Sequence, residues 1–188
     1  LHQRRYRGRN PGGDRLTFTA HSWRRVLGID PGSRVTGFGI IETDGRHSRH
    51  VASGCITTVD KAFTDRLGTI FGELATLVDH HRPAEAAVEQ VFVAKNPNSA
   101  LKLGQARGAA ITAVVQAGLP VFEYTPRAVK QAIVGTGGAE KAQVAHMVRV
   151  LLNLRETLAS DVADALADAL CHSHTSASRV VLAAGSAT

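Results

Sequence analysis

The chain has 188 residues, which is enough for one domain with a sizeable core and too few for two full α/β domains. Apolar residues make up 44% of it, no apolar run is long enough to cross a bilayer, and two cysteines cannot form a disulfide framework. These features exclude a disulfide-scaffolded secreted protein and a polytopic membrane protein. They favour a cytoplasmic protein with no membrane partner.

The net charge of +6 belongs to one end of the chain. Residues 1–25 contain seven arginines and one aspartate, so residues 26–188 are neutral overall. We expect 1–25 to be a flexible basic leader, for which processing, cloning or a misassigned start is a better explanation than a DNA-binding arm. Within the neutral body, residues 95–149 carry a net charge of +5. On charge alone, we interpret these residues as solvated helix faces rather than a binding surface.

Taken in chain order, short apolar and β-branched runs alternate with stretches in which apolar residues recur every three or four positions. Turns follow the first two runs, at Pro31-Gly32 and Asp44-Gly45. The pattern predicts strands at 26–30, 35–43, 49–58, 85–93 and 121–124, and helices at 61–81, 98–117, 126–134, 140–154 and 160–172. Residues 175–188 are expected to form a loose C-terminal tail.

The order of these elements predicts an α/β fold with a mixed five-stranded sheet and helices on both faces. Hairpins join the first three strands, and the crossover through helix 61–81 places strand 85–93 parallel to an earlier strand. With strands 26–30 and 85–93 side by side, their C-terminal ends meet at one edge of the sheet. Open α/β sheets hold their ligands at that edge.

Four acidic residues occupy positions where an apolar side chain would be ordinary. Asp30 ends the most apolar strand, and Glu89 lies inside the fourth strand. Asp161 and Asp164 are three apart on an otherwise apolar helix, so they project from the same face. Carboxylates gathered at one place repel one another unless cations neutralise them, and oxygen ligands suit Mg²⁺ or Mn²⁺ rather than zinc. Two such ions can clamp the attacking and leaving oxygens of a phosphodiester displacement.

Each acid also has an ordinary structural explanation. Asp30 precedes Pro-Gly and can form an Asx turn, Glu89 can lie on a solvated strand face, and Asp161 can interact with the N-terminal end of its helix. The four together favour a metal site over these separate explanations. At the other end of the last helix, we interpret Cys171, His172 and His174 as ordinary surface groups rather than a transition-metal cluster.

Four segments, in this order, resemble the bacterial RuvC Holliday-junction resolvases: VLGIDPGSRVTGFGIIE (26–42), EQVFVAKNPNSALKLGQARGAA (89–110), FEYTPRAVKQAIVGTGGAEKAQVAHMV (122–148) and SDVADALADALCH (160–172). The resemblance covers 26–174, which we take as a nuclease domain. It implies a ribonuclease-H-like fold and a homodimer. It also implies an endonuclease that resolves four-way DNA junctions in recombination and repair, with two Mg²⁺ or Mn²⁺ ions per active site. Further implications are 5′-phosphate products and joint action with the RuvA–RuvB branch-migration complex.

The resemblance also assigns roles to individual residues. The family's catalytic, metal-binding acids match four positions: Asp30, Glu89, Asp161 and Asp164. Its DNA-contacting residues match Phe92, which would stack on a base, and the lysines Lys130 and Lys141. The basic segment adds three further candidates for DNA binding: Lys95, Lys102 and Arg107.

Asp168 departs from the family pattern, because an apolar residue is expected at this position. It lies seven residues after Asp161 and therefore on the same helix face. We expect a solvent-exposed end of that face rather than an outer group of the site.

The helix at 98–117 is the candidate dimer interface. Ala100, Gly104 and Gly108 form a strip of small side chains at four-residue spacing, with Leu101, Ile111 and Val115 beside it. Small residues let a second helix approach closely. The alternative is that the strip packs against the protein's own sheet.

Three other functions fit parts of the sequence. A ribonuclease-H-fold nuclease could act on another substrate, such as an RNA–DNA hybrid, and a non-catalytic protein could bind junctions without cutting them. The four acids argue against binding alone. An actin-like ATPase is suggested by Asp30-Pro31-Gly32 followed by Gly37 and Gly39, but 188 residues cannot supply its two domains.

Overall fold

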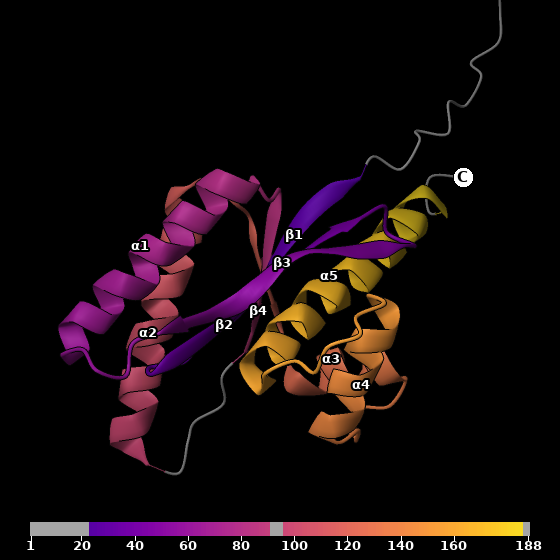
Figure 1. The fold of residues 1–188 in the computed structure, drawn as a ribbon. Coiled ribbons are helices and arrows are strands. Elements are labelled where there is room, and N and C mark those ends of the chain that lie inside the picture. Colours follow the sequence, from indigo (N-terminus) through magenta and orange to yellow (C-terminus); the bar gives the residue numbers. More distant parts are fainter. Residues whose placement is uncertain (1–22, 91–95, 186–188) are drawn as a thin grey trace, which may run out of the picture.

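The structure is a computed structural model that describes residues 23–90 and 96–185. Its elements, shown in Figure 1, are β1 (Arg24–Asp30), β2 (Val35–Thr43), β3 (Ser48–Thr57), α1 (Phe63–His81), β4 (Glu85–Glu89), α2 (Pro97–Gln116), β5 (Val121–Tyr124), α3 (Pro126–Val134), α4 (Lys141–Leu151) and α5 (Ser160–Gly185). Within the described residues, no helix is both long and apolar enough to span a membrane.

The five strands form one mixed sheet in the order β3-β2-β1-β4-β5. β1 and β2 pair antiparallel, as do β2 and β3, whereas β4 runs parallel to both β1 and β5. The predicted fold class is therefore confirmed, including the parallel pairing of the first and fourth strands. Because β1 and β4 run in the same direction, Asp30 and Glu89 end their strands at the same edge of the sheet.

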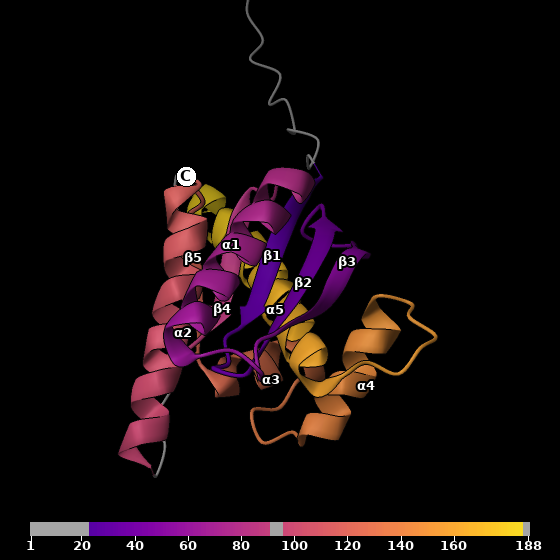
Figure 2. The same ribbon diagram turned by 60° about the vertical axis from the view of Figure 1, so that its left-hand side comes forward.

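Helices cover both faces of the sheet (Figures 1 and 2). The alternation of side chains along β1 divides the core in two. Leu27 and Ile29 pack toward α1 and α2, whereas Val26 belongs to the core shared with α3, α4 and α5. The last helix, α5, runs across β1 and β2, so its first turns lie above the edge where β1 ends.

Glycines in β1 and β2 let α5 approach the sheet closely. A Cβ added to Gly28 would lie 1.9 Å from the Ala165 carbonyl oxygen, and one added to Gly37 would lie 2.0 Å from that of Asp161. Gly37 is the strand partner of Asp30, so this contact sets α5 directly over the end of β1. Gly37 and Gly39, which together with Asp30-Pro31-Gly32 suggested an actin-like ATPase, thus serve helix packing.

Local sequence signals set the starts of the shorter helices. Thr125 caps α3 by accepting a hydrogen bond from the Ala128 amide, and Pro126 fills the first helical position. Glu140 and Gln143 form a capping box at the start of α4. This box fixes the place of Lys141, the first residue of α4.

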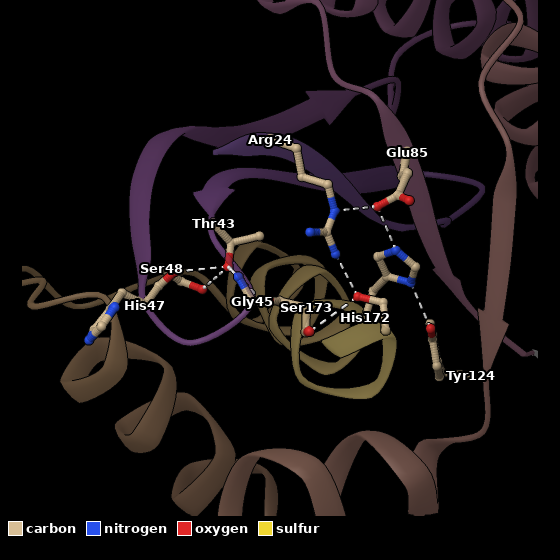
Figure 3. Close-up of polar contacts among 10 residues, drawn as sticks. Arg24, Thr43, Gly45, His47, Ser48, Glu85, Tyr124, His172 and Ser173 are labelled. Carbon is tan, nitrogen blue, oxygen red and sulfur yellow. Dashed lines mark hydrogen bonds and ion pairs between the residues drawn. The ribbon is translucent and has the colours of Figure 1, made fainter. Parts of the chain in front are cut away.

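A polar network ties α5 to the opposite edge of the sheet, where β1 and β4 begin (Figure 3). Arg24 Nε donates to Glu85 Oε2 at 2.9 Å, and His172 Nε2 lies 2.9 Å from the same oxygen. His172 Nδ1 in turn lies 2.7 Å from the Tyr124 hydroxyl. His172 is buried and so is Cys171, so their interpretation as surface groups is wrong. Together with Tyr124 of β5, the network joins α5 to three strands.

Several boundaries differ from the predicted ones. β1 begins at Arg24, so the last two residues assigned to the leader are part of the sheet. β4 ends at Glu89, and the rest of the predicted strand reaches residues 91–95, which lie outside the described residues. α4 ends at Leu151, three residues early. α5 continues to Gly185, so residues 175–185, expected in a loose tail, are helical.

Candidate active site

Two strand ends and one helix bring the four predicted acids to the same edge of the sheet. Asp30 ends β1 and Glu89 ends β4, and both are half-buried. Asp161 and Asp164 stand in the first turns of α5, which the contact at Gly37 places over that edge. Side chains that are 131 positions apart in sequence, such as Asp30 and Asp161, are thereby positioned by rigid elements rather than loops.

Electrostatics shows that these carboxylates act on one another. Burial raises the pKa of Asp30 to about 7, and the negative charges of Asp164, Glu89 and Asp161 add to the rise. Burial likewise raises the pKa of Glu89, with a further contribution from Asp164. Lys141 opposes both shifts. The site therefore holds more negative charge than the protein's own cations balance.

Lys141 is the nearest counter-charge. Its Nζ donates to Asp164 Oδ2 at 2.8 Å, and this hydrogen bond raises the pKa of Lys141. Lys130, on α3, also lowers the pKa of Glu89. The two lysines predicted to contact DNA thus lie beside the acids, on the helices α3 and α4.

A cavity of about 240 Å³ opens between α3, α4 and α5 next to these groups. Glu89, Asp164, Lys130 and Lys141 all contribute to its walls, together with apolar residues of α3, α4 and α5. Acids and lysines therefore face the same solvent-filled space. Such a space suits a polyanion that reaches the acids along a basic wall.

Asp168 also lines this cavity, and its predicted exposure is wrong. Its side chain is only 2% exposed, and burial raises its pKa well above the ordinary value, helped by the charges of Glu89, Asp30 and Asp164. The sequence contained a signal for this burial: apart from Asp168 itself, residues 165–171 are all apolar. A helix face that is apolar throughout is covered, so an acid within it is covered as well.

The donor set fits a hard divalent cation. All the candidate ligands are carboxylate oxygens, the preferred ligands of Mg²⁺ and Mn²⁺. Burial is the main cause of the raised pKa values of Asp30 and Glu89, and neighbouring negative charge, which a cation would neutralise, adds to it. Across residues 23–90 and 96–185, however, no group of three or more Asp, Glu, His or Cys side chains is placed so that it could hold a metal ion. In addition, Asp164 is paired with Lys141. The shared metal site stays a prediction.

Of the other predicted DNA-binding residues, Arg107 contacts the main chain of Glu89, Lys102 lies elsewhere on α2, and two fall outside the described residues. Arg107, on α2, forms an ion pair with Glu123 at 2.8 Å, and its Nε lies 3.5 Å from the Glu89 carbonyl oxygen. Lys102 lies over the ring of Phe63, 5.9 Å from its centre. Phe92 and Lys95 lie outside the described residues.

The predicted interface strip on α2 faces away from the sheet. A Cβ added to Gly104 or Gly108 would meet no atom within 4 Å, and both residues are exposed. Beside them, the side chains of Leu101 and Val115 are 64% and 54% exposed. The alternative that these two glycines pack against their own sheet is therefore wrong.

Comparison with known proteins places this geometry in a family. The family model described as crossover junction endodeoxyribonuclease RuvC matches residues 26–172. The protein of that name from Alkalilimnicola ehrlichii is 61% identical over 150 residues, which cover 80% of this chain and 91% of the relative. The one from Marinobacter nauticus is 58% identical over 149 residues, covering 79% and 85%. Among solved structures, T. thermophilus RuvC in complex with Holliday junction substrate aligns with a TM-score of 0.79 at 36% identity, covering 83% of this chain and 96% of that one.

Proposed function

The chain belongs to the RuvC family of crossover junction endodeoxyribonucleases, and we propose that it resolves four-way DNA junctions by hydrolysing phosphodiester bonds at the carboxylate cluster. The observation that supports this site is the mutual influence of Asp30, Glu89, Asp161 and Asp164 at one edge of the sheet. The products would carry 5′-phosphate ends. The setting would be the cytoplasm, in recombination and repair.

The family implies dependence on a divalent metal, and the finer proposal is two Mg²⁺ or Mn²⁺ ions per site. Asp30 and Glu89 would hold them from the strand ends, and Asp161 and Asp164 from α5. Bound there, the ions supply Lewis-acid chemistry at the scissile phosphate. Strand ends and a packed helix restrict these carboxylates, which reduces the reorganisation needed in the reaction.

The lysines beside the cluster have a separate task in this proposal. Lys130 stands on the cavity wall and would contact the DNA backbone, where each neutralised phosphate releases counterions. Lys141 is three-quarters exposed although it is paired with Asp164. Its ammonium group can therefore meet a phosphate at the mouth of the cavity. Phe92, Lys95, Lys102 and Arg107 stay predictions for DNA contact.

Two coordinated cuts in a junction need two active sites, so we propose a two-fold homodimer. Gly104 and Gly108 face outward on α2, and with the exposed Leu101 and Val115 they support α2 as the interface, to which Ala100 would also belong. The partnership with RuvA–RuvB is proposed on family membership alone.

The test is cleavage of a labelled synthetic four-way junction, with a linear duplex and an RNA–DNA hybrid as alternative substrates. We expect symmetric cuts in the junction with Mg²⁺ or Mn²⁺ and none in EDTA. Asp161→Asn should abolish cutting and retain junction binding in a gel-shift assay, because phosphate contacts come from other residues. Asp79→Asn removes an exposed carboxylate on α1 and serves as the control. Preferential cutting of the hybrid would contradict the proposal.

A further inference from the structure

Arg107 is one of the residues predicted to contact DNA, but its guanidinium group is engaged within the protein. Its side chain is only 20% exposed, and its Nη2 atom lies 2.8 Å from Glu123 Oε2. Its Nε atom donates to the Glu89 carbonyl oxygen at 3.5 Å. The second contact joins α2 to the main chain of one of the four acids at the site.

The end of β4 explains why a donor is needed at this carbonyl group. The β1–β4 ladder ends at the pair Ile29 and Val88, which engages the Glu89 amide with β1. The amide and carbonyl groups of one strand residue face the same neighbouring strand, so the Glu89 carbonyl also faces β1. The next donor on β1 would be the amide of residue 31, but Pro31 has no N–H group. The ladder therefore cannot supply a donor to the Glu89 carbonyl oxygen.

The same peptide group is held on its other side by β5. The Gln90 amide donates to the Tyr124 carbonyl oxygen at 2.8 Å. Because a peptide group is planar, the Glu89 carbonyl and the Gln90 amide move as one unit. Arg107 on the carbonyl and Tyr124 on the amide thus hold the peptide that follows Glu89 at both ends. The ladder holds the peptide that precedes Glu89, so the direction of the Glu89 side chain is set as well.

Arg107 reaches Glu89 from the face of the sheet opposite to α5. The helices α1 and α2 share one half of the core, and α3, α4 and α5 share the other (Figure 1). Glu89 lines the cavity between α3, α4 and α5. The guanidinium group can therefore support the main chain from behind and leave the carboxylate free for a cation.

We propose that Arg107 is a positioning residue, which replaces the donor missing at Pro31 and thereby holds the Glu89 carboxylate toward the other acids. The inference rests on the proposed function, since it concerns the same site. The ion pair with Glu123 fixes the guanidinium group, whose planar fork makes both contacts at once. Arg107 also links α2, the candidate dimer interface, to the carboxylate cluster.

Three substitutions separate positioning from DNA contact. Arg107→Ala removes both contacts, and Arg107→Lys keeps the charge but cannot reproduce the fork. Glu123→Ala leaves Arg107 in place without its anchor. A DNA contact predicts stronger junction binding in Glu123→Ala, because a cation is released and an acid is removed. Positioning predicts weaker metal binding in the same variant.

The matched control is Arg82→Lys at the end of α1. Arg82 makes the same two kinds of contact at an exposed place: its Nε donates to the Asp79 carbonyl oxygen at 2.7 Å, and its Nη2 lies 3.0 Å from Asp79 Oδ1. Loss of this fork should not affect the acids. Urea unfolding of each variant shows that the fold is retained, and if Arg107→Ala fails to fold, Arg107→Lys and Glu123→Ala carry the test.

The experiment measures Mn²⁺ binding to the full chain without DNA, from the electron spin resonance signal of free Mn²⁺. We expect Arg107→Ala and Arg107→Lys to weaken binding by roughly tenfold or more, as is usual for groups that orient metal ligands. Glu123→Ala should weaken it by a smaller factor, and Arg82→Lys should bind Mn²⁺ like the parent chain. Junction binding in EDTA, measured by gel shift, should stay close to parental in every variant.

Parental Mn²⁺ affinity in both Arg107 variants would overturn the inference. Weaker junction binding with unchanged Mn²⁺ affinity would return Arg107 to the DNA contacts. Full Mn²⁺ affinity in Arg107→Lys, with a loss in Arg107→Ala, would also overturn the inference, because the charge rather than the fork would then be responsible. A parent chain that binds Mn²⁺ but cuts no junction would refute the proposed function and leave this inference intact.

Discussion

At the scale of single residues, the charge on Asp30 links the site to the stability of the fold. Burial and three neighbouring carboxylates raise its pKa to about 7. A pKa raised in the folded state favours folding below the ordinary pKa of about 4, and that stability is lost as the pH rises through about 7. The metal-free protein therefore gives up stability in order to keep this acid beside Glu89 and Asp164.

We expect Asp30→Asn to raise the free energy of unfolding of the metal-free protein by on the order of 1 kcal/mol at pH 8, while abolishing junction cutting. The gain should shrink toward pH 4, where the aspartate is protonated in the folded state. Urea unfolding of the parent and the variant at both pH values in EDTA measures it. An equal difference at pH 4 and pH 8 would show that the effect does not come from ionisation.

The site residues also show where sequence reasoning succeeds. Asp30, Glu89, Asp161 and Asp164 could be singled out because acids in apolar segments are costly, and the order of the elements placed two of them at one sheet edge. Asp168 belongs to the same pattern, but its exposure was predicted wrongly. The prediction considered only the helix face that Asp168 shares with Asp161, and it left out the apolar residues on both sides of Asp168, which indicate burial.

At the scale of elements, the contact between α5 and β2 positions half of the carboxylates. We expect Gly37→Ala to destabilise the protein by about 1–3 kcal/mol, because the added Cβ would overlap the Asp161 carbonyl. Displacement of Asp161 and Asp164 should also slow cutting, by on the order of 100-fold for a shift of about 1 Å.

The matched control is Gly72→Ala on α1, where an added Cβ meets no atom within 4 Å. Alanine favours helix over glycine by up to about 1 kcal/mol, so this variant should be as stable as the parent or more so. Urea unfolding and junction cleavage of both variants are the measurements. Full activity in Gly37→Ala would mean that α5 can shift without disturbing the acids.

The polar network of Arg24, Glu85 and His172, at the opposite edge of the sheet, holds the middle of α5 in place. Burial raises the pKa of Glu85, but hydrogen bonds from His172 and Arg24 lower it more, so it ends below the ordinary glutamate range. A lowered pKa contributes stability above about pH 4, and this stability is lost as the pH falls through the folded-state pKa.

We expect Glu85→Gln to lower the free energy of unfolding by about 1–2 kcal/mol at pH 7, with the difference narrowing below about pH 4. Thermal unfolding across that range is the measurement. Asp79→Asn, which breaks an exposed pair with Arg82, should change stability by less than about 0.5 kcal/mol. If Glu85→Gln loses the same stability at every pH, the contribution of Glu85 comes from packing rather than from its charge.

Sequence patterns predicted each helix and strand that the structure describes. The wrong predictions mainly concern the burial of residues whose surroundings are set by tertiary contacts. The β-branched strands and the periodic helices are local signals, and the parallel neighbours followed from the crossover rule. The burial of His172 could not be predicted in the same way. Glu85 and Tyr124, which both contact His172, lie in strands 87 and 48 positions away.

At the scale of the whole molecule, one face of α2 has no partner within the described chain. Gly104 and Gly108 face outward, and Leu101 and Val115 expose most or about half of their side chains. Exposed apolar side chains beside a strip of small residues indicate a contact surface. If that contact joins two copies, the active sites are related by the two-fold symmetry that paired cuts in a junction require.

We expect Gly108→Leu to yield a folded monomer that binds junctions more weakly and nicks one strand at most. An added side chain at Gly108 meets open space within its own chain, so folding should be unaffected, whereas a second α2 could no longer approach closely. Gly72→Leu, an equal increase in volume on the outward face of α1, should stay dimeric and resolve junctions. Sedimentation equilibrium gives the mass of each variant, and a junction labelled on both cleaved strands separates nicking from resolution. A dimeric, fully active Gly108→Leu would place the interface on another element.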